Sequence, residues 1–421
     1  MRRLLLLLTI LFLSRTAGAS DCPVIPLPAA CRLGAGEFRL NERTAIIPED
    51  PGLYDAARGL QGLLLEKTGH ALPIRYDKAA GQTSISIRRD AALGDEEAYR
   101  LSISPQQIII EGKEEAGFFY GNISLLQLLQ YYARDARGKV NRLKGREFHG
   151  QPEGTGNSRK QPGKLQMAGM EAQANAGRPG NKVELTIPCW QIEDGPAYPW
   201  RGIMLDEARH FFGKEKVKQL LDLMARYKLN RFHWHLTDVQ GWRIEIKGYP
   251  ELALTGGIGN RSDPEAPAKY YTQEEISEII AYARERQIEV IPEIDMPGHA
   301  GAANRAYPEY AAKHPPGRSA FTFNPGLEST YQYLSDILKE TDALFPFQMI
   351  HLGGDEVAMG TGLWSEDPAI LSLMREKQLD SLSDVEHYFI ERMADTVLSL
   401  GNQVLAWEEA ANAGLPADET V

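Results

Sequence analysis

Two acidic residues, Asp355 and Glu356, follow two glycines at the end of an apolar run in the motif HLGGDEV. Neighbouring residues of a regular strand point to opposite faces, so a strand could not deliver both carboxylates to one pocket. Gly353 and Gly354 remove this restriction, because glycine lets the backbone turn sharply where a strand ends. We therefore expect both carboxylates to face a single ligand.

Two carboxylates in one partly desolvated site repel each other, so their pKa values are expected to separate. One group then stays ionised while the other keeps its proton near neutral pH, which suits a general acid beside an electrostatic stabiliser. An ordinary acidic loop is the alternative interpretation of the Asp355–Glu356 pair.

Polar residues also follow the other strand-like segments of the second half of the chain. Arg209, Asp238, His299 and Trp407 each stand at or just beyond such a segment. The five segments are WRGIMLD (200–206), RFHWHL (231–236), IEVIPEID (288–295), FQMIHLGGDE (347–356) and QVLAW (403–407).

Helical patterns separate these strand-like segments. KEKVKQLLDLMARY has an apolar face, Thr272 with Glu275 forms a capping box for the next helix, and Ser383 with Glu386 is expected to cap a later one. Alternating strands and helices predict parallel strands with right-handed crossovers. In a (β/α)8 barrel the carboxyl ends of the strands converge, so the polar residues would line one pocket. A doubly wound sheet, which would spread them along a crevice, is the alternative fold.

The sequence suggests five successive regions. Residues 1–19 read as a cleaved signal peptide, with two arginines, a short apolar run and small residues at the cleavage point, so we expect a secreted or periplasmic protein. Residues 20–133 predict a small α/β domain with an antiparallel sheet, and 134–182 a mobile low-complexity insertion. Residues 183–198 are expected to form a connector, and 199–421 the barrel domain.

Composition limits the classes of partner. The net charge of −11 argues against nucleic acid or an acidic membrane surface as a partner, and no segment after the signal peptide could span a bilayer. No glycine-rich phosphate motif or GxSxG motif appears, and we expect no cofactor. His233 and His235 share one strand face and, with Asp238, leave a metal site as an alternative. Cys22 and Cys31 could pair in an oxidising compartment.

From Tyr198 to Trp407 the chain resembles the family 20 glycoside hydrolases, the β-N-acetylhexosaminidases. The resemblance rests on the motifs WRGIMLDEARHFF, HWHLTDVQGWRIEIKGYPEL, VIPEIDMPGHAGA, HLGGDEV and VLAWEE. The upstream stretch LGDEEAYRLSISPQQIIIEGKEEAGFFYGNISLLQLL is similar to the small N-terminal domain of that family. The resemblance implies a barrel enzyme that removes terminal β-linked N-acetylglucosamine or N-acetylgalactosamine from glycans with retention of configuration.

Family chemistry is substrate-assisted: the sugar's own 2-acetamido oxygen attacks the anomeric carbon and forms an oxazolinium intermediate. The resemblance implies that Glu356 is the general acid and then the base, and that Asp355 orients the acetamido group. Arg209 would bind the outer hydroxyls of the sugar. Asp238 and His299 would support Glu356 and the ring, and Trp407 would wall the acetamido pocket.

Two features depart from the family pattern. Val239 stands where the family usually has a second aspartate, and the chain stops at Val421 after the fifth predicted strand, whereas the family barrel continues through three more. We therefore expect about five βα units of an incomplete barrel. An inactive fragment, or a remnant that binds the sugar without turnover, is the alternative to an active enzyme. The oligomeric state does not follow from the sequence.

Overall fold

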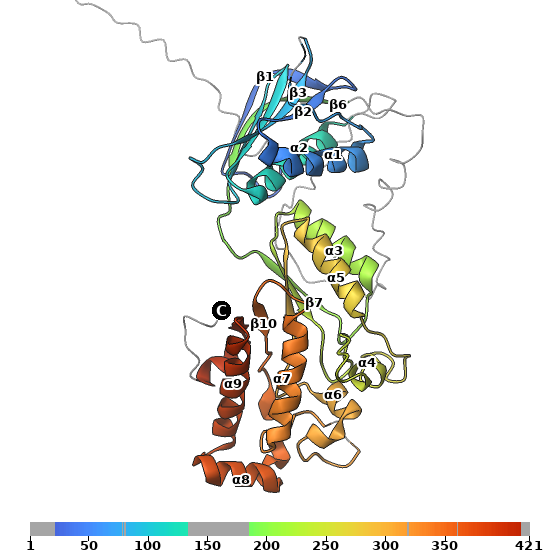
Figure 1. Cartoon of the computed structure of the whole chain (residues 1–421), viewed down its shortest axis with the longest axis vertical. Helices are drawn as coiled ribbons and strands as arrows, with labels where there is room; N and C mark the ends of the chain where they lie inside the picture. Colours follow the sequence, from blue (N-terminus) through green and yellow to red (C-terminus); the bar gives the residue numbers. More distant parts are fainter. Residues whose placement is uncertain are drawn as a thin grey trace, which may run out of the picture. The chain divides into compact units, whose positions relative to one another are not determined.

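The computed structural model describes residues 22–133 and 185–413, apart from positions 78, 80, 318, 319 and 360. The chain divides into two compact units, with the division between Pro199 and Trp200 (Figure 1). The expected signal peptide, residues 1–19, and the expected insertion, residues 134–182, lie outside the described residues.

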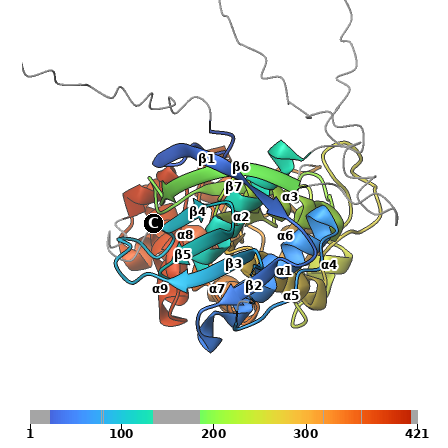
Figure 2. The same ribbon diagram turned by 90° about the horizontal axis from the view of Figure 1, so that it is seen from above.

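The first unit contains a six-stranded sheet with the order β1-β6-β4-β5-β3-β2, which Figure 2 shows strand by strand. Its strands are β1 (Ala30–Leu40), β2 (Ala45–Pro48), β3 (Ser84–Arg89), β4 (Tyr99–Ile103), β5 (Gln107–Gly112) and β6 (Leu185–Asp194). The expected antiparallel pairing holds for β1–β6, β4–β6 and β4–β5, whereas β2–β3 and β3–β5 are parallel. The sheet is therefore mixed, because a helical connection lets β2 and β3 run in the same direction.

Strand β6 corrects the expectation of a connector at residues 183–198. It pairs with β1 on one side and with β4 on the other, so it lies inside the sheet. Leu185, Ile187 and Cys189 are buried and alternate with less buried neighbours, the period expected of a strand with one covered face. This segment therefore belongs to the first unit, although the sequence places it far from the other strands.

Two helices complete the core of the first unit: α1 (Tyr54–Thr68), preceded by the 3-10 turn η2 (Pro51–Leu53), and α2 (Glu115–Tyr132). Helix α2 packs against β4, β5 and β6 and is buried along most of its length. It approaches the sheet closely at Gly117 and Gly121, where an added Cβ would lie 2.4 Å from the Ala98 oxygen and 2.7 Å from Ile110 Cγ2. These glycines are therefore required by packing.

The second unit is built on a parallel sheet with the order β11-β10-β9-β8-β7. Its strands are β7 (Gly202–Asp206), β8 (Arg231–His235), β9 (Glu289–Glu293), β10 (Met349–His351) and β11 (Gln403–Leu405). All four pairings are parallel, and strands adjacent in sequence are adjacent in the sheet. This simple order agrees with five βα units of a barrel and not with a doubly wound sheet, in which the strand order reverses.

Helices separate the strands of the second unit, as the alternating pattern predicts. They are α3 (Lys214–Arg226), α4 (Glu251–Leu254), α5 (Gln273–Arg284), α6 (Gly301–Ala306), α7 (Glu328–Asp342), α8 (Pro368–Lys377) and α9 (Leu382–Ser399). Four 3-10 turns accompany them: η3 (Pro308–Tyr310), η4 (Val357–Met359), η5 (Thr361–Glu366) and η6 (Glu408–Ala413). Helix α3 packs beside α5, and α7 beside α9 (Figure 1).

Two helix caps test the sequence interpretation directly. The capping box of Thr272 and Glu275 at the start of α5 is confirmed. At α9 the prediction is wrong by two residues, because Ser381 and Asp384 form the capping box in place of Ser383 and Glu386. Ser381 has the extended backbone that a cap requires.

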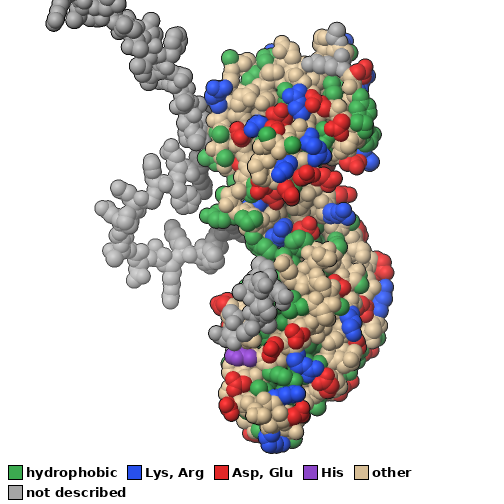
Figure 3. Space-filling model, turned by 60° about the vertical axis from the view of Figure 1, so that its left-hand side comes forward, with side chains coloured by type: hydrophobic (Ala, Val, Ile, Leu, Met, Phe, Trp, Pro, Cys, Tyr) green, Lys and Arg blue, Asp and Glu red, His purple; other side chains and the backbone are tan. Residues whose placement is uncertain are grey.

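The helices and the surface of the described residues show neither a membrane span nor a region of one charge on the face drawn in Figure 3. Within the described residues, none of the helices combines the length and apolar character needed to cross a bilayer. Basic and acidic side chains are interspersed over the face of the molecule drawn in Figure 3.

Cys31 and the buried Cys189 carry free thiols, so the disulfide that the sequence allows between Cys22 and Cys31 is not formed in this structure.

Candidate active site

The parallel sheet of the second unit brings the predicted site residues to the carboxyl ends of its strands. Arg209 follows β7, Asp238 follows β8, His299 follows β9, the Asp355–Glu356 pair follows β10, and Trp407 follows β11. Parallel strands end at the same edge of a sheet, so these residues, distant in sequence, lie along one edge.

The turn after β10 has the conformation that the two glycines predict. Gly353 and Gly354 have φ values of +70° and +86°, and Glu356 has φ +52°. An added Cβ on Gly353 would lie 1.9 Å from Asp295 Oδ1, and the Gly354 amide lies 3.4 Å from the same oxygen, to which it donates. Position 353 therefore requires glycine for two reasons. Its φ is positive, and the buried Asp295 carboxyl group leaves no room for a side chain.

His299 connects three of the predicted acidic residues. Its Nδ1 lies 3.1 Å from Asp238 Oδ1, and its Nε2 lies 3.5 Å from both Asp355 Oδ2 and Glu356 Oε2. The Asp355 side chain is 24% exposed, whereas the Glu356 side chain is 54% exposed. The structure therefore gathers this histidine and these three carboxylates, with Glu356 on the solvent side.

Arg209 reaches the same cluster through Asp238. Its Nη2 forms an ion pair with Asp238 Oδ2, and its Nη1 donates to Asp206 Oδ2 at 3.1 Å. The His235 ring lies 3.3 Å from Asp238 Oδ2. Burial raises the pKa of Asp238, but hydrogen bonds from His235 and His299 and the charge of Arg209 outweigh it and leave that pKa well below its usual range.

Glu293, at the end of β9, lies at the centre of a second group of contacts that the sequence interpretation missed. Its Oε2 lies 2.6 Å from His235 Nδ1 and 2.8 Å from His233 Nε2. Its Oε1 accepts the Trp407 indole N–H at 3.0 Å and lies 3.4 Å from His351 Nδ1. The sequence offered one indication of this role: Glu293 stands inside the apolar strand IEVIPEID, and a carboxylate buried there needs hydrogen-bond partners.

These contacts shift the pKa values of the buried histidines in opposite directions. Burial lowers the pKa of His235, but hydrogen bonds to Asp238 and Glu293 raise it to about 10. Burial lowers the pKa of His351 to about 3, so this ring stays neutral at physiological pH. At Glu293 burial raises the pKa, but hydrogen bonds from His233 and His235 hold it well below its usual range. An anionic Glu293 thus faces a cationic His235.

The two aspartates nearest the glycine turn behave in the opposite way. Burial, together with the negative charges of Glu293 and Asp355, raises the pKa of Asp295 well above its usual range. Burial also raises the pKa of Asp355, against the lowering effect of His299. Neutral forms of these two groups are therefore favoured more than in water.

The two histidines of the metal alternative fall in two different groups of possible ligands: His233 lies with Glu293 and His351, and His235 lies with Asp238 and Asp295. Both rings contact the Glu293 carboxylate, and His235 also contacts Asp238. The His233 ring packs against those of His351 and Trp407, with centroids 4.5 and 5.6 Å away. His235 therefore hydrogen-bonds to Glu293 and Asp238, whereas His233 contacts the Glu293 carboxylate at 2.8 Å.

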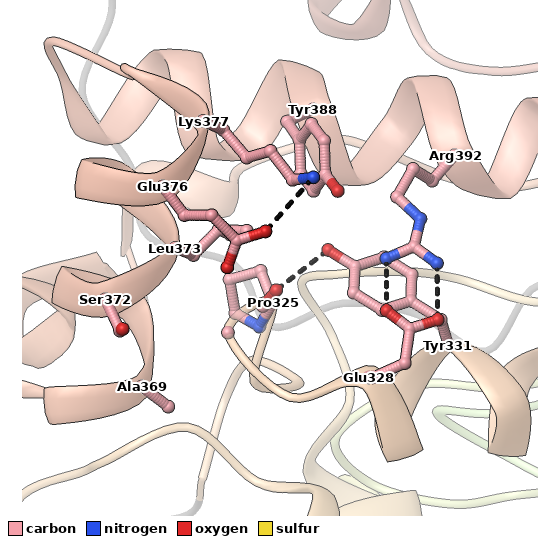
Figure 4. Close-up of a pocket in the computed structure, with 11 residues that line it drawn as sticks. Pro325, Glu328, Tyr331, Ala369, Ser372, Leu373, Glu376, Lys377, Tyr388 and Arg392 are labelled. Atoms are coloured by element: carbon pink, nitrogen blue, oxygen red, sulfur yellow. Dashed lines mark hydrogen bonds and ion pairs between the residues drawn. The ribbon is translucent and has the colours of Figure 1, made fainter.

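A pocket formed by residues of α7, α8 and α9 and the loop before α7 is a competing location for chemistry, and Figure 4 shows its side chains. Arg392 and Glu328 approach across it with two hydrogen bonds of 2.8 and 2.7 Å. The Arg392 guanidinium also lies 3.7 Å from the centre of the Tyr331 ring. Because these groups satisfy each other, the strand ends remain the better candidate site.

Family models match both units of the chain. The model described as "Glycosyl hydrolase family 20, catalytic domain" matches residues 198–421. The model described as "Glycosyl hydrolase family 20, domain 2" matches residues 21–145.

Curated relatives agree with these matches. A β-hexosaminidase from Porphyromonas gingivalis is 32% identical over 406 residues, which cover 94% of this chain and 47% of the relative. A β-hexosaminidase from Vibrio furnissii is 35% identical over 81% of this chain and 50% of its own length. The chain thus spans about half the length of these relatives.

Solved structures show the same similarity. A family 20 exo-β-N-acetylglucosaminidase from Vibrio harveyi, crystallised with N-acetylglucosamine, superimposes with a TM-score of 0.76 at 29% identity and covers 95% of this chain and 56% of that protein. An N-acetyl-β-hexosaminidase from Streptomyces plicatus gives a TM-score of 0.71 at 30% identity, over 97% of this chain and 69% of that one. With both units matched in sequence and in fold, the chain belongs to glycosyl hydrolase family 20.

Proposed function

We propose that this protein hydrolyses terminal, non-reducing β-linked N-acetylglucosamine or N-acetylgalactosamine residues of glycans by a retaining, substrate-assisted mechanism. The observation that carries the proposal is the position of His299 Nε2, 3.5 Å from both Asp355 and Glu356. Two carboxylates beside one imidazole suit a reaction in which one group moves a proton and the other stabilises positive charge.

Glu356 is assigned the role of general acid and then of base. It is the more exposed carboxylate of the pair, so it can reach the glycosidic oxygen of a bound sugar. His299 lies behind it, and Asp238 holds the other ring nitrogen, which keeps the imidazole in a fixed orientation. Such general acid–base catalysis contributes about 10² to 10⁴ in rate.

Asp355 is assigned to the 2-acetamido group of the sugar. Its partly buried carboxylate can accept the acetamido N–H and stabilise the positive charge of the oxazolinium ring. The acetamido oxygen acts as the nucleophile, and attack within one molecule lowers a barrier by about 7 to 11 kcal/mol. No second enzyme carboxylate is then needed to attack the anomeric carbon.

Arg209 and Trp407 are assigned to binding of the sugar. Arg209 is fixed by Asp206 and Asp238 and offers its remaining donors to sugar hydroxyls. The Trp407 indole donates to Glu293 and is only partly buried, so its ring can wall the acetamido pocket. Aromatic faces of this kind supply apolar contact area beside polar groups.

The test is release of the chromophore from an aryl N-acetyl-β-glucosaminide. We expect Glu356→Gln to abolish turnover of this substrate, because the amide cannot transfer the proton. Glu408→Gln, an exposed acidic residue after Trp407, is the matched control and should retain turnover. Well-folded protein without turnover, judged by a cooperative thermal transition, would contradict the proposal.

A binding function without turnover is the second candidate. The observation in its favour is the 54% exposure of the Glu356 side chain, because a catalytic acid usually acts in a water-excluded site. Calorimetry with N-acetylglucosamine separates the two candidates: binding by folded but inactive protein would favour the second. The same titration with Arg209→Ala should lose the binding heat.

We also propose that the protein is secreted or periplasmic, on the basis of the sequence pattern of residues 1–19. Amino-terminal sequencing of the protein from its native source should give Ser20 as the first residue. An intact Met1 would contradict this proposal.

A further inference from the structure

Three buried polar atoms beside the glycine turn have no hydrogen-bond partner in the part of the chain that the structure describes. They are Asp295 Oδ2, His299 Nε2 and Asp355 Oδ1. Asp295 and His299 are only 2% and 5% exposed. Buried polar groups are normally satisfied, so three unsatisfied atoms in one place indicate a missing partner.

The three side chains converge. One potential ligand atom from each of Asp295, His299 and Asp355 lies within 4.8 Å of the other two. His299 Nε2 is 3.5 Å from Asp355 Oδ2 without making a hydrogen bond to it. A cation between these atoms would satisfy all three side chains at once.

His299 is held as metal-binding histidines usually are. Its Nδ1 contacts the buried carboxylate of Asp238 at 3.1 Å. A carboxylate at one ring nitrogen places the proton there and leaves the lone pair of the other nitrogen for a metal. In this structure that other nitrogen is the unsatisfied Nε2.

The donor set selects the kind of ion. One imidazole nitrogen and two carboxylate oxygens are ligands of Zn²⁺, whereas Mg²⁺ and Ca²⁺ prefer oxygen alone. Asp295 also lies beside the negative charges of Glu293 and Asp355, and a divalent cation would offset this repulsion. We propose that Asp295, His299 and Asp355 form a binding site for Zn²⁺ and that zinc bound there competes with the sugar reaction.

The competition follows from shared atoms. Asp355 is assigned to the acetamido group, and His299 to the support of Glu356, so a zinc ion on both would remove them from the reaction. Zinc would therefore inhibit the proposed hydrolysis. This consequence rests on the proposed function, but zinc binding itself requires neither sugar nor turnover.

The first experiment is calorimetric titration of Zn²⁺ into the full chain without sugar. We expect saturable binding of one ion per chain and no comparable binding of Mg²⁺. Asp295→Asn removes a ligand and should abolish this binding, and Asp238→Asn should weaken it about 10- to 100-fold. His314→Gln, which changes an exposed histidine outside the cluster, is the matched control and should bind zinc as the wild type does.

The outcomes are decisive in both directions. Absence of saturable zinc binding by the wild type would overturn the proposal, and so would equal binding by folded Asp295→Asn. If Asp295→Asn does not fold, zinc X-ray absorption of the wild type decides. Nitrogen and oxygen ligands at about 2.0 to 2.2 Å support the site, and a sulfur ligand at about 2.3 Å contradicts it.

Discussion

At the residue scale, the candidate site holds more acidic groups than basic ones, and their contacts decide which of them are charged. Asp238 and Glu293 have strong donors and lowered pKa values, whereas Asp295 and Asp355 have raised pKa values. Acidic groups at one edge of the sheet therefore differ in pKa, because Asp238 and Glu293 accept hydrogen bonds from more donors than Asp295 and Asp355 do. His235 is the donor that the two ionised groups share.

The first prediction concerns the shared donor. The folded-state pKa of His235 is about 10, above the ordinary value of 6.5. The stabilisation from protonated His235 is therefore fully present below about pH 6.5 and is lost as pH rises through about 10. Denaturant unfolding should show the free energy of unfolding of the wild type falling across this range. His235→Gln should lack this fall, and the control His314→Gln should keep it; an unchanged slope in His235→Gln would contradict the assignment.

The second prediction concerns the turn that carries the acidic pair. Gly353 and Gly401 both have positive φ, but an added Cβ has no neighbour within 4 Å at Gly401 and would lie 1.9 Å from Asp295 Oδ1 at Gly353. Gly401→Ala should cost about 1 kcal/mol of unfolding free energy from conformation alone. Gly353→Ala should cost about 3 kcal/mol or more, because overpacking adds to the conformational cost. Equal costs for the two variants in denaturant unfolding would contradict this reading of the turn.

At the element scale, the site exists because each strand of the second unit is followed by a polar residue at its carboxyl end. Helices on the return path keep the strands parallel, so these ends meet at one edge of the sheet. Helix caps determine the residue at which each connecting helix begins. The sequence located the cap of α5 correctly and misplaced the cap of α9.

The third prediction distinguishes the observed cap of α9 from the one expected from the sequence. Ser381 Oγ accepts the Asp384 amide at 3.1 Å, so Ser381→Ala should lower the free energy of unfolding by about 1 kcal/mol. Ser383 is exposed within the first turn, so Ser383→Ala should change it by less than about 0.5 kcal/mol. Paired denaturant unfolding measures both, and the reverse order of costs would restore the original expectation.

At the scale of the whole molecule, the chain consists of two units with separate cores. The core of the first unit gathers side chains from its sheet and from α1 and α2, while the candidate site lies entirely in the second. The first unit is therefore expected to contribute to stability rather than to supply reacting groups.

The fourth prediction follows from this division. Leu125 in α2 is fully buried, so Leu125→Ala should destabilise the first unit by about 2 to 5 kcal/mol. The control Leu65→Ala, at a side chain that is 51% exposed, should change stability by about 0.5 kcal/mol or less. Thermal unfolding monitored by calorimetry should show the loss in one transition only. A shift of every transition by the same amount would mean that the two units unfold as one.

The sequence by itself determined the parallel strands and the residues at their ends, whereas the strand order that excludes a doubly wound sheet came from the structure. The apolar periods of strands and helices are local patterns in the sequence. The adjacent glycines Gly353 and Gly354 likewise predict a turn from local sequence alone. Val239, in the place where the family usually has an aspartate, is also visible from the sequence alone. The signal peptide, the insertion and the roles of the site residues stay predictions.

Only the tertiary structure decided which buried groups share partners. Strand β6 pairs across a long stretch of chain with β1 and β4, and no local pattern specifies such a pairing. Glu293 and His351 likewise meet only because β9 and β10 are neighbours in the sheet. Hydrogen bonds and charge interactions depend on distances of a few ångströms, and residues far apart in sequence acquire those distances only when the sheet forms.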